Sequence, residues 1–224
     1  MSAAQSALRA GVLRTVAESI PAGSGDSGVR VAVDGRDGAG KTIFADELAI
    51  AVRRSGRPVV RVSADDFHNQ RAVRYRRGRD SALGFWLDSY DYQRLRTDVL
   101  EPLGPGGSRR YRRAAHDLRT DRMLDPAPLI APAGAVLILD GLFLHRDELV
   151  GCWELSIYLD APVDVTVRRL ADRDGSSPDV DHPTLRRYLQ AHQLYAAACT
   201  PADRADFLID NSAIDAPMIL RRPD

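Results

Sequence analysis

The chain has 224 residues, of which 44% are hydrophobic, 28% charged and 6% aromatic, and this composition is typical of a globular domain with its own core. No apolar run approaches the roughly 20 residues that a membrane-spanning helix needs, so we expect no membrane partner. Lysine plus arginine number 31, as do aspartate plus glutamate, and this zero net charge argues against a protein dedicated to nucleic-acid binding.

The N-terminal segment and the two cysteines bear on the cellular location. The first residues contain no apolar stretch followed by a cleavage site, so they do not predict a secretory signal. Cys152 and Cys199 are far apart in the sequence and have no metal-ligand spacing. We therefore expect a reducing, cytoplasmic environment. The sequence leaves the oligomeric state open, a homo-oligomer included.

Strands and helices are predicted to alternate along the chain. We expect helices over residues 5–20, from residue 41 to the stop at Gly56, and over residues 92–103, 163–172 and 183–199. We expect strands over residues 29–33, 57–63, 135–139, 155–159 and 207–209, with a linker at residues 21–25. Such alternation predicts an α/β fold, in which a parallel sheet is flanked by helices in three layers. Ligands of such sheets gather beyond the carboxyl ends of the strands.

The one lysine of the chain lies in a glycine-rich segment between a predicted strand and a predicted helix. Residues 35–42 read GRDGAGKT, which has the spacing of a phosphate-binding P-loop. Glycines let the backbone curl around phosphates, the helix start adds a positive dipole, and lysine supplies a compact charge. The threonine hydroxyl suits Mg²⁺. We therefore predict that ATP is bound by Gly35, Arg36, Asp37, Gly38, Ala39, Gly40, Lys41 and Thr42.

Carboxylates follow two further predicted strands. Asp65 and Asp66 come after the strand at 57–63, and Asp140 follows the continuous apolar run at 135–139. We predict that Asp140 holds Mg²⁺ together with Thr42, as strand-end acids do in phosphoryl transfer. Asp65 and Asp66 are adjacent and point in different directions, so at most one of them orients the hydroxyl that accepts the phosphoryl group.

Four segments together resemble the uridine kinase family of P-loop nucleoside kinases, which is related to phosphoribulokinase and pantothenate kinase. These segments read GRDGAGKT, SADDFH, ILDG and LDAPVDVTVRRLADRD, within residues 28–212. The resemblance implies that Asp65, rather than Asp66, is the catalytic aspartate and that Asp140 is the metal-associated acid, where the family has Glu. It implies a single kinase domain over residues 1–224, with an N-terminal helix at 1–22, a substrate flap at about 104–120 and a lid at about 168–182.

The same resemblance implies a nucleoside acceptor. The segment SYDY matches the place where an aspartate, here Asp91, holds sugar hydroxyls, and the segment RYRRAAH matches the place where Tyr111 and His116 contact the base. The implied reaction is ATP-dependent phosphorylation of uridine or cytidine at the 5′-hydroxyl. Arg169 and Arg173 of the lid are expected to close over the transferred phosphate and to exclude water.

Departures from the family pattern keep other functions open. Arg112 replaces the aspartate that follows the flap tyrosine, and the lid lacks an Arg-Gly-Arg run. Arginines also cluster at residues 71–79 and 109–113, either as solvated surface or as contacts to another, anionic acceptor. The alternatives are a kinase of pantothenate, nicotinamide riboside or a sugar phosphate, a regulatory ATPase without an acceptor, and a nucleotide-binding interaction module.

Overall fold

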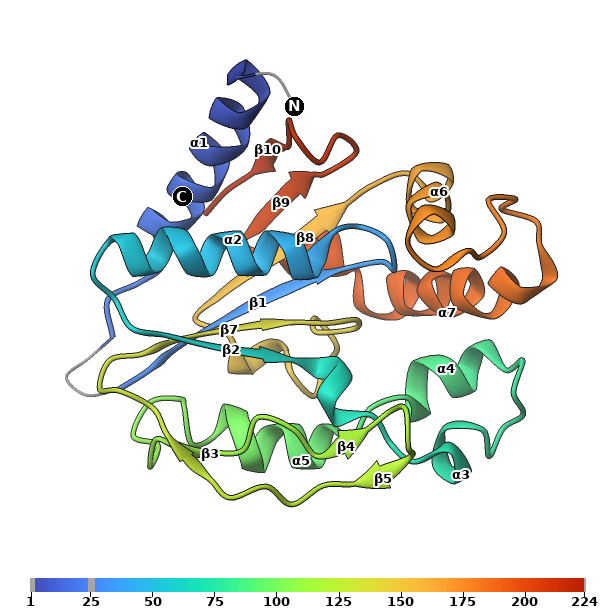
Figure 1. Cartoon of the computed structure of the whole chain (residues 1–224), viewed down its shortest axis with the longest axis horizontal. Coiled ribbons are helices and arrows are strands. Elements are labelled where there is room, and N and C mark those ends of the chain that lie inside the picture. Colours follow the sequence, from blue (N-terminus) through green and yellow to red (C-terminus); the bar gives the residue numbers. More distant parts are fainter. Residues whose placement is uncertain (1–2, 24–26, 224) are drawn as a thin grey trace.

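A six-stranded sheet forms the centre of the protein, as the computed structural model shows for the described residues, 3–23 and 27–223 (Figure 1). The strand order is β10–β9–β8–β1–β7–β2. The strands are β1 Val29–Gly35, β2 Val59–Ser63, β7 Val136–Asp140, β8 Leu155–Asp160, β9 Phe207–Asp210 and β10 Met218–Arg221. The five strands from β2 to β9 run parallel, and β10 is antiparallel to β9.

The register of the central strands brings three strand ends to one edge of the sheet. Asp140 at the end of β7 lies opposite Val33 of β1 and opposite Ser63, the last residue of β2. Every residue of β7 is buried, which explains its continuous apolar sequence. The carboxyl ends of β1, β7 and β2 therefore lie side by side, where ligands of such sheets bind.

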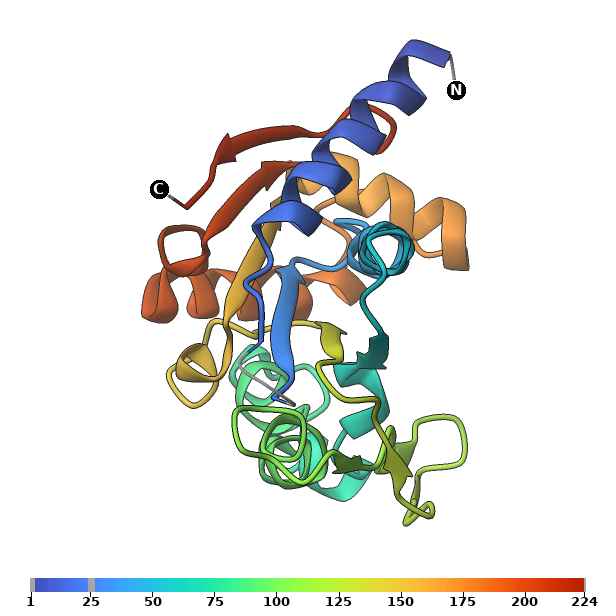
Figure 2. The ribbon, with the colours of Figure 1, turned by 90° about the vertical axis from the view of Figure 1, so that its left-hand side faces the viewer.

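Helices cover both faces of the sheet and complete three layers (Figure 2). On one face, α1 and α2 bury apolar side chains such as Phe44 and Leu48 against the strands. On the opposite face, α5, η2 and α7 bury Leu100 and Tyr195. The helices are α1 Ala3–Ser19, α2 Lys41–Arg54, η1 Ala64–Phe67, α3 Arg71–Arg74, α4 Ala82–Asp88, α5 Tyr92–Leu95, η2 Arg96–Leu100, η3 Val150–Cys152, α6 Val163–Asp174, α7 Pro183–Cys199 and α8 Pro201–Arg204. The predicted α/β fold is thus confirmed.

The helix expected over residues 92–103 changes its winding along its length. It begins as the α-helix α5 and continues as the π-helical segment η2, in which the Glu101 amide donates to the Arg96 carbonyl oxygen at 2.8 Å. Leu95 and Leu100 are five residues apart and both are fully buried in the same core. A π turn brings residues five apart onto one helix face, so both side chains can pack there.

Among the elements not predicted from the sequence, which include the short helical segments η1, α3, η3 and α8, two extend the main layers of the fold. One is α4, which packs against α7 and begins after Ser81, whose hydroxyl accepts a hydrogen bond from the Gly84 amide at 3.0 Å. The other is β10, an edge strand whose residues alternate between exposed and half-buried. Neither element changes the fold class, since β10 only extends the sheet beyond β9.

The residues expected to form a flap and a lid contain the following elements. Residues 104–120 contain β3 Arg110–Tyr111 and β4 His116–Asp117, which pair with β6 Leu129–Ile130 and β5 Arg122–Met123 in two short ribbons. Residues 168–174 belong to α6, and residues 175–182 join α6 to α7. Residues 1 and 2 of the expected N-terminal helix and residues 24 and 25 of the expected linker lie outside the described part of the chain. Within the described part, no helix combines the length and apolar character needed to cross a membrane.

Candidate active site

The glycine-rich loop joins β1 to α2 at the carboxyl edge of the sheet. Gly40, directly before α2, has φ 90°, and Gly38 has φ 76°. A Cβ atom on Gly38 would overlap the carbonyl oxygen of Thr166 in α6, so this position needs glycine for space as well as for conformation. The loop is closed by the Asn211 amide, which donates to the Ala39 carbonyl oxygen at 2.6 Å. Left-handed glycines before a helix start give the curled backbone that cradles phosphates.

Lys41 and Thr42 are the first two residues of α2 and line a cavity of about 430 Å³ along this loop. The Lys41 ammonium donates to the Arg36 carbonyl oxygen at 2.9 Å. The Thr42 hydroxyl donates to Asp140 Oδ2 at 2.7 Å, and Arg61 donates to Asp140 Oδ1 at 2.9 Å. The hydroxyl and carboxylate oxygens are hard ligands beside a point charge, and this donor set fits a phosphate chain with Mg²⁺.

Asp65 lies on η1, immediately after β2, and is held from two sides. Its Oδ1 accepts a hydrogen bond from the Tyr90 hydroxyl at 2.9 Å, and its carbonyl oxygen is 2.7 Å from His68 Nδ1. Burial raises the pKa of Tyr90 well above its ordinary value, so this hydroxyl remains a donor. Burial lowers the pKa of His68, so the neutral ring donates through Nδ1. The two rings lie 4.5 Å apart between centroids.

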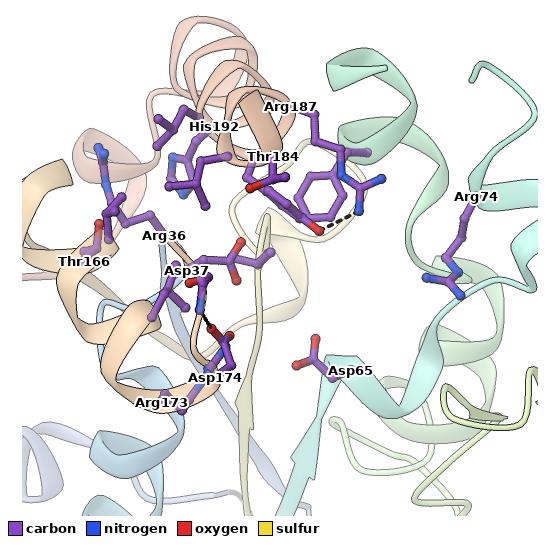
Figure 3. A pocket seen from close by; sticks show the side chains of 18 of the residues that line it. Arg36, Asp37, Asp65, Arg74, Thr166, Arg173, Asp174, Thr184, Arg187 and His192 are labelled. Carbon is purple, nitrogen blue, oxygen red and sulfur yellow. Dashed lines mark hydrogen bonds and ion pairs between the residues drawn. The ribbon is translucent and has the colours of Figure 1, made fainter. Parts of the chain in front are cut away.

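A second cavity, of about 760 Å³, meets the first one at Asp65 (Figure 3). Both cavities are lined by Asp37, Asp65, Leu142, Leu170 and Arg173. Asp66 lines neither cavity, and its backbone oxygen accepts a hydrogen bond from the Ala115 amide at 2.9 Å. The structure therefore places Asp65, and not its neighbour, where the two cavities join.

Three charged side chains converge at this junction. Burial raises the pKa of Asp37, nearby Lys41 acts in the opposite direction, and Asp65 adds to the rise. Arg173, on α6, pairs with Asp174 at 3.1 Å and also faces both cavities. Arg173 is thus a cation that both cavities share, where it can stabilise negative charge on a bound phosphate.

The two arginines expected in the lid lie in different environments. Arg169 lines the smaller cavity and donates to the carbonyl oxygens of Asn211 and Ser212 at 2.9 and 2.7 Å, so its guanidinium tethers α6 to the segment after β9. Arg173 lies one helical turn later and lines both cavities. Of these two arginines, Arg173 is therefore the one that faces the junction.

Three residues expected to bind the substrate lie outside the walls of both cavities. Asp91 caps α5, where its Oδ1 accepts a hydrogen bond from the Arg94 amide at 3.0 Å. His116 is buried in β4, with its Nε2 3.1 Å from Asp121 Oδ1. Tyr111 lies in β3, opposite Leu129 of β6. In this structure their contacts are those of a helix cap and two ribbons.

Other residues line the larger cavity in their place. Tyr75 lies just after α3, Phe85 on α4, and Arg187, Tyr188 and His192 on α7. The sequence analysis does not assign a role to any of these five residues. The sequence held one signal for α7. The helix predicted at residues 183–199 starts at the carboxyl edge of the sheet, where ligands gather, so its first turns could have been expected to line the site.

The fold, the glycine-rich loop and the two joined cavities define a P-loop kinase. The family model described as Phosphoribulokinase / Uridine kinase family matches residues 30–183, and the chain belongs to this family. A comparison with curated proteins gives no match. Kinases of this family use ATP and act on small molecules, so the chain is a small-molecule kinase by family.

Solved structures with the same fold carry different names. A structure described as a possible uridine kinase from Bacillus stearothermophilus has a TM-score of 0.69 and 22% identity over 89% of this chain and 96% of that one. A structure described as a putative fructose transport system kinase from Silicibacter sp. TM1040 has a TM-score of 0.64 and 24% identity over 89% of this chain and 96% of that one. Phosphoribulokinase from Rhodobacter spheroides has a TM-score of 0.57 and 17% identity over 89% of this chain and 76% of that one. At these identities the likeness supports the fold alone.

Proposed function

We propose that this protein is a cytoplasmic enzyme that transfers the γ-phosphoryl group of ATP, with Mg²⁺, to the hydroxyl group of a small molecule. The observation that carries the proposal is the position of Asp65, which lines both the cavity of the phosphate loop and the larger cavity next to it. A group at this junction can reach an acceptor on one side and a phosphate on the other. Both cysteines are free, as suits a reducing compartment.

Each charged group at the junction has a role in this proposal. Gly35 to Thr42 hold the phosphates of ATP, which supplies the electrophilic phosphorus, while Thr42 and Asp140 hold Mg²⁺. Asp65 accepts the acceptor's hydroxyl proton at Oδ2, since Oδ1 is bound by Tyr90. The new oxygen–phosphorus bond forms as the bond to the bridging oxygen of ADP breaks. Arg173 stabilises the charge on the transferred group.

Uridine and cytidine are the acceptors that the resemblance implies, and they belong in any first substrate panel. The residues on which that implication depends, Asp91, Tyr111 and His116, lie outside the cavity walls. The solved structures of the same fold are described as a possible uridine kinase, a fructose transport system kinase and a phosphoribulokinase, so the fold does not choose among acceptors. The proposed acceptor is therefore a small molecule with a reactive hydroxyl group, and neither the fold nor these three residues identifies its chemical class.

Substitution of Asp65 tests the proposal. ADP release and product mass are measured with nucleosides, sugars, sugar phosphates and carboxylated alcohols, for the wild type, Asp65→Asn and Asp66→Asn. We expect transfer by Asp65→Asn to fall by about 10²- to 10⁴-fold with ATP binding unchanged, because the group that orients the hydroxyl is lost. Asp66→Asn is the matched control, since it changes the adjacent carboxylate that lines neither cavity.

Three outcomes would contradict the proposal. Loss of transfer in Asp66→Asn with Asp65→Asn unaffected would show that the two aspartates have been assigned the wrong way round. ATP turnover that no alcohol changes would favour a regulatory ATPase, and ATP binding without any turnover would favour an interaction module. Lys41→Ala serves as the check on the phosphate loop, and unchanged ATP binding and turnover in that variant would remove the loop from the site.

A further inference from the structure

Positive side chains predominate in the wall of the larger cavity. Among the described residues that line it are five arginines and three aspartates. The two histidines of the wall are neutral near pH 7, because burial lowers the pKa of both, that of His192 to about 4. The charged residues are Arg36, Arg71, Arg74, Arg173, Arg187, Asp37, Asp65 and Asp174. The cavity therefore carries an excess of positive charge.

This excess is concentrated away from the phosphate loop. The three aspartates lie at the loop, at the junction and in the lid, where Asp174 already pairs with Arg173 at 3.1 Å. Figure 3 shows Arg74 across the cavity from Arg36 and Asp37 of the loop, and Arg187 projecting from α7. Arg71 lies one turn before Arg74 on α3. We call Arg71, Arg74 and Arg187 the arginine group.

Aromatic rings, rather than carboxylates, hold two members of this group. The Tyr75 ring lies 5.3 Å from the guanidinium carbon of Arg74 and 5.7 Å from that of Arg187, and the Tyr188 ring lies 4.5 Å from the latter. The Arg187 guanidinium donates hydrogen bonds to the Tyr188 hydroxyl and to the Arg79 carbonyl oxygen, neither of which is a carboxylate. A cation stacked on a ring keeps its N–H edges free for a ligand.

Carboxylates neutralise this group poorly. Within the described chain, Arg74 has one ion pair, with Asp121 at 3.8 Å, and its buried Nε has no hydrogen-bond partner. Asp121 is already bonded to the Arg71 amide at 2.9 Å and to His116 at 3.1 Å. Asp121 also interacts with the Arg71 charge, which helps to lower the pKa of that carboxyl group, so one carboxylate is shared by two arginines. Cations in a cavity wall are stabilised by an anion that brings its own oxygens.

The same contacts disfavour a stacked base. Arg187 covers Phe85 at 5.6 Å as well as Tyr75 and Tyr188, so these three aromatic residues already pack against a guanidinium. Guanidinium groups donate hydrogen bonds and accept none, whereas a nucleobase edge presents both kinds of group. Phosphate and carboxylate oxygens are pure acceptors and match the arginine group.

We infer that Arg71, Arg74 and Arg187 form an anion subsite and that the acceptor is an alcohol with a phosphate or carboxylate group at the end remote from its reacting hydroxyl. The inference rests on the proposed function, because it names the acceptor class of the same site. In this arrangement the anionic end lies at the arginine group and the hydroxyl lies at Asp65. The subsite acts by positioning, and the transfer step itself is unchanged.

A binding experiment tests the subsite without knowledge of the acceptor. The phosphate loop is first filled with a non-hydrolysable ATP analogue and Mg²⁺, and orthophosphate is then titrated by calorimetry. We expect orthophosphate to bind the filled wild type and to bind Arg74→Gln about 10- to 100-fold more weakly, as the loss of a charge-assisted hydrogen bond implies. Arg74→Lys keeps the charge and should bind with intermediate affinity.

Arg79→Gln is the matched control. Arg79 also lies over the Tyr75 ring, at 4.9 Å, but it is exposed and does not line the cavity. Its variant should bind orthophosphate as the wild type does. Arg187→Gln, on a different helix, should reproduce the effect of Arg74→Gln, and equal melting temperatures exclude loss of folding. Absence of orthophosphate binding to the filled wild type, or equal binding in all variants, would overturn the inference.

Turnover of matched alcohols distinguishes the two anionic groups. Glycerol is compared with glycerol 3-phosphate and glycerate, and ribose with ribose 5-phosphate, alongside uridine and cytidine. We expect turnover only of anionic members, with a KM about 10- to 100-fold higher in Arg74→Gln and a kcat changed far less. Turnover of uridine with the same KM in Arg74→Gln would overturn the subsite and leave the kinase proposal standing. Failure of the ATP analogue to bind would instead count against the kinase proposal.

Discussion

At the scale of single residues, the Asp65 carboxylate depends on a tyrosine from another part of the chain. Tyr90 follows α4 and donates to Asp65 Oδ1 at 2.9 Å, and its ring packs on His68. The bond occupies one carboxylate oxygen and leaves the other for an acceptor. Tyr90 is thus a positioning residue for the proposed reaction.

Replacement of Tyr90 by phenylalanine tests this role. We expect kcat for phosphoryl transfer to fall by about tenfold with ATP affinity unchanged, because one hydrogen bond to a charged group is lost while the ring remains. Steady-state kinetics and nucleotide binding provide the measurement. Tyr92→Phe is the control, because that neighbouring ring lies beneath Arg146 rather than beside Asp65. A similar fall of kcat in both variants would argue against positioning by Tyr90.

Residues of the candidate site were predictable from the sequence where they lie within one short segment at the end of a strand. Lys41, Thr42 and Asp65 each lie in or directly after a strand-end segment, and the structure brings all three to the cavities. Asp91 and His116 illustrate the limit, because a short sequence match cannot show that one carboxylate caps α5 and that the imidazole is bonded to Asp121. Such bonds depend on neighbours that only the folded chain supplies.

At the scale of elements, the phosphate loop is constrained by α6 as well as by its own sequence. Gly38 and Gly56 have similar φ angles, 76° and 84°, but only Gly38 faces another backbone, that of Thr166. Gly56, at the end of α2, has open space around it. Comparison of these two glycines therefore distinguishes the cost of a left-handed backbone, which both share, from the cost of a close contact with α6, which applies to Gly38 alone.

Alanine at these two positions gives the corresponding prediction. Gly56→Ala should lower the free energy of unfolding by about 1–2 kcal/mol, the cost of a left-handed alanine. Gly38→Ala should lower it by about 2–5 kcal/mol, because overpacking against Thr166 adds to that strain, and it should also weaken ATP binding. Urea unfolding and nucleotide titration measure both effects. Equal losses of stability would show that the contact with α6 has no effect.

Helices and strands were predictable from the sequence where their apolar residues form a clear pattern. Strands β1, β7 and β8 are buried throughout or nearly so, and their sequences are rich in apolar and β-branched residues, with a continuous apolar run in β7. The edge strand β10 has alternating exposed residues and packs on one side only, so its pattern is weak. The larger cavity could not be predicted as a unit, since Arg74 and Arg187 lie on separate elements that meet only in the tertiary structure.

At the scale of the whole molecule, a buried polar cluster connects β1, which carries the phosphate loop, to α7, which lines the larger cavity. Asp34, at the base of the phosphate loop, accepts hydrogen bonds from His145 Nδ1 at 2.8 Å and from the Tyr195 hydroxyl of α7. Burial acts to raise the pKa of Asp34, but these bonds hold it below its ordinary value. The cluster fixes α7, whose residues line the larger cavity, to the strand that carries the loop.

The stability of the molecule should depend on pH through His192. This residue of α7 is 6% exposed, and burial together with Arg36 lowers its pKa to about 4, whereas an unfolded histidine titrates near 6.5. The unfolded chain therefore binds a proton between these values that the folded chain does not. The contribution of neutral His192 to the free energy of unfolding is complete above pH 6.5 and is lost as the pH falls toward 4.

Unfolding of the wild type and of His192→Gln at two pH values measures this contribution. Between pH 6.5 and pH 5 the wild type should lose about 2 kcal/mol more of unfolding free energy than the variant, as the interval of about 1.5 pH units implies. His68 shifts in the same direction and is present in both proteins. Identical pH dependence in the two proteins would contradict the assignment.

The composition of the chain gives Lys41 a practical importance. It is the one lysine in the sequence, and its ammonium nitrogen lies 2.9 Å from the Arg36 carbonyl oxygen, within the glycine-rich loop. Amine-directed fluorophores, cross-linkers and immobilisation resins usually spread over many exposed lysines. Here their one lysine target is in the pocket itself, so attachment through a thiol or an added tag would leave that pocket accessible.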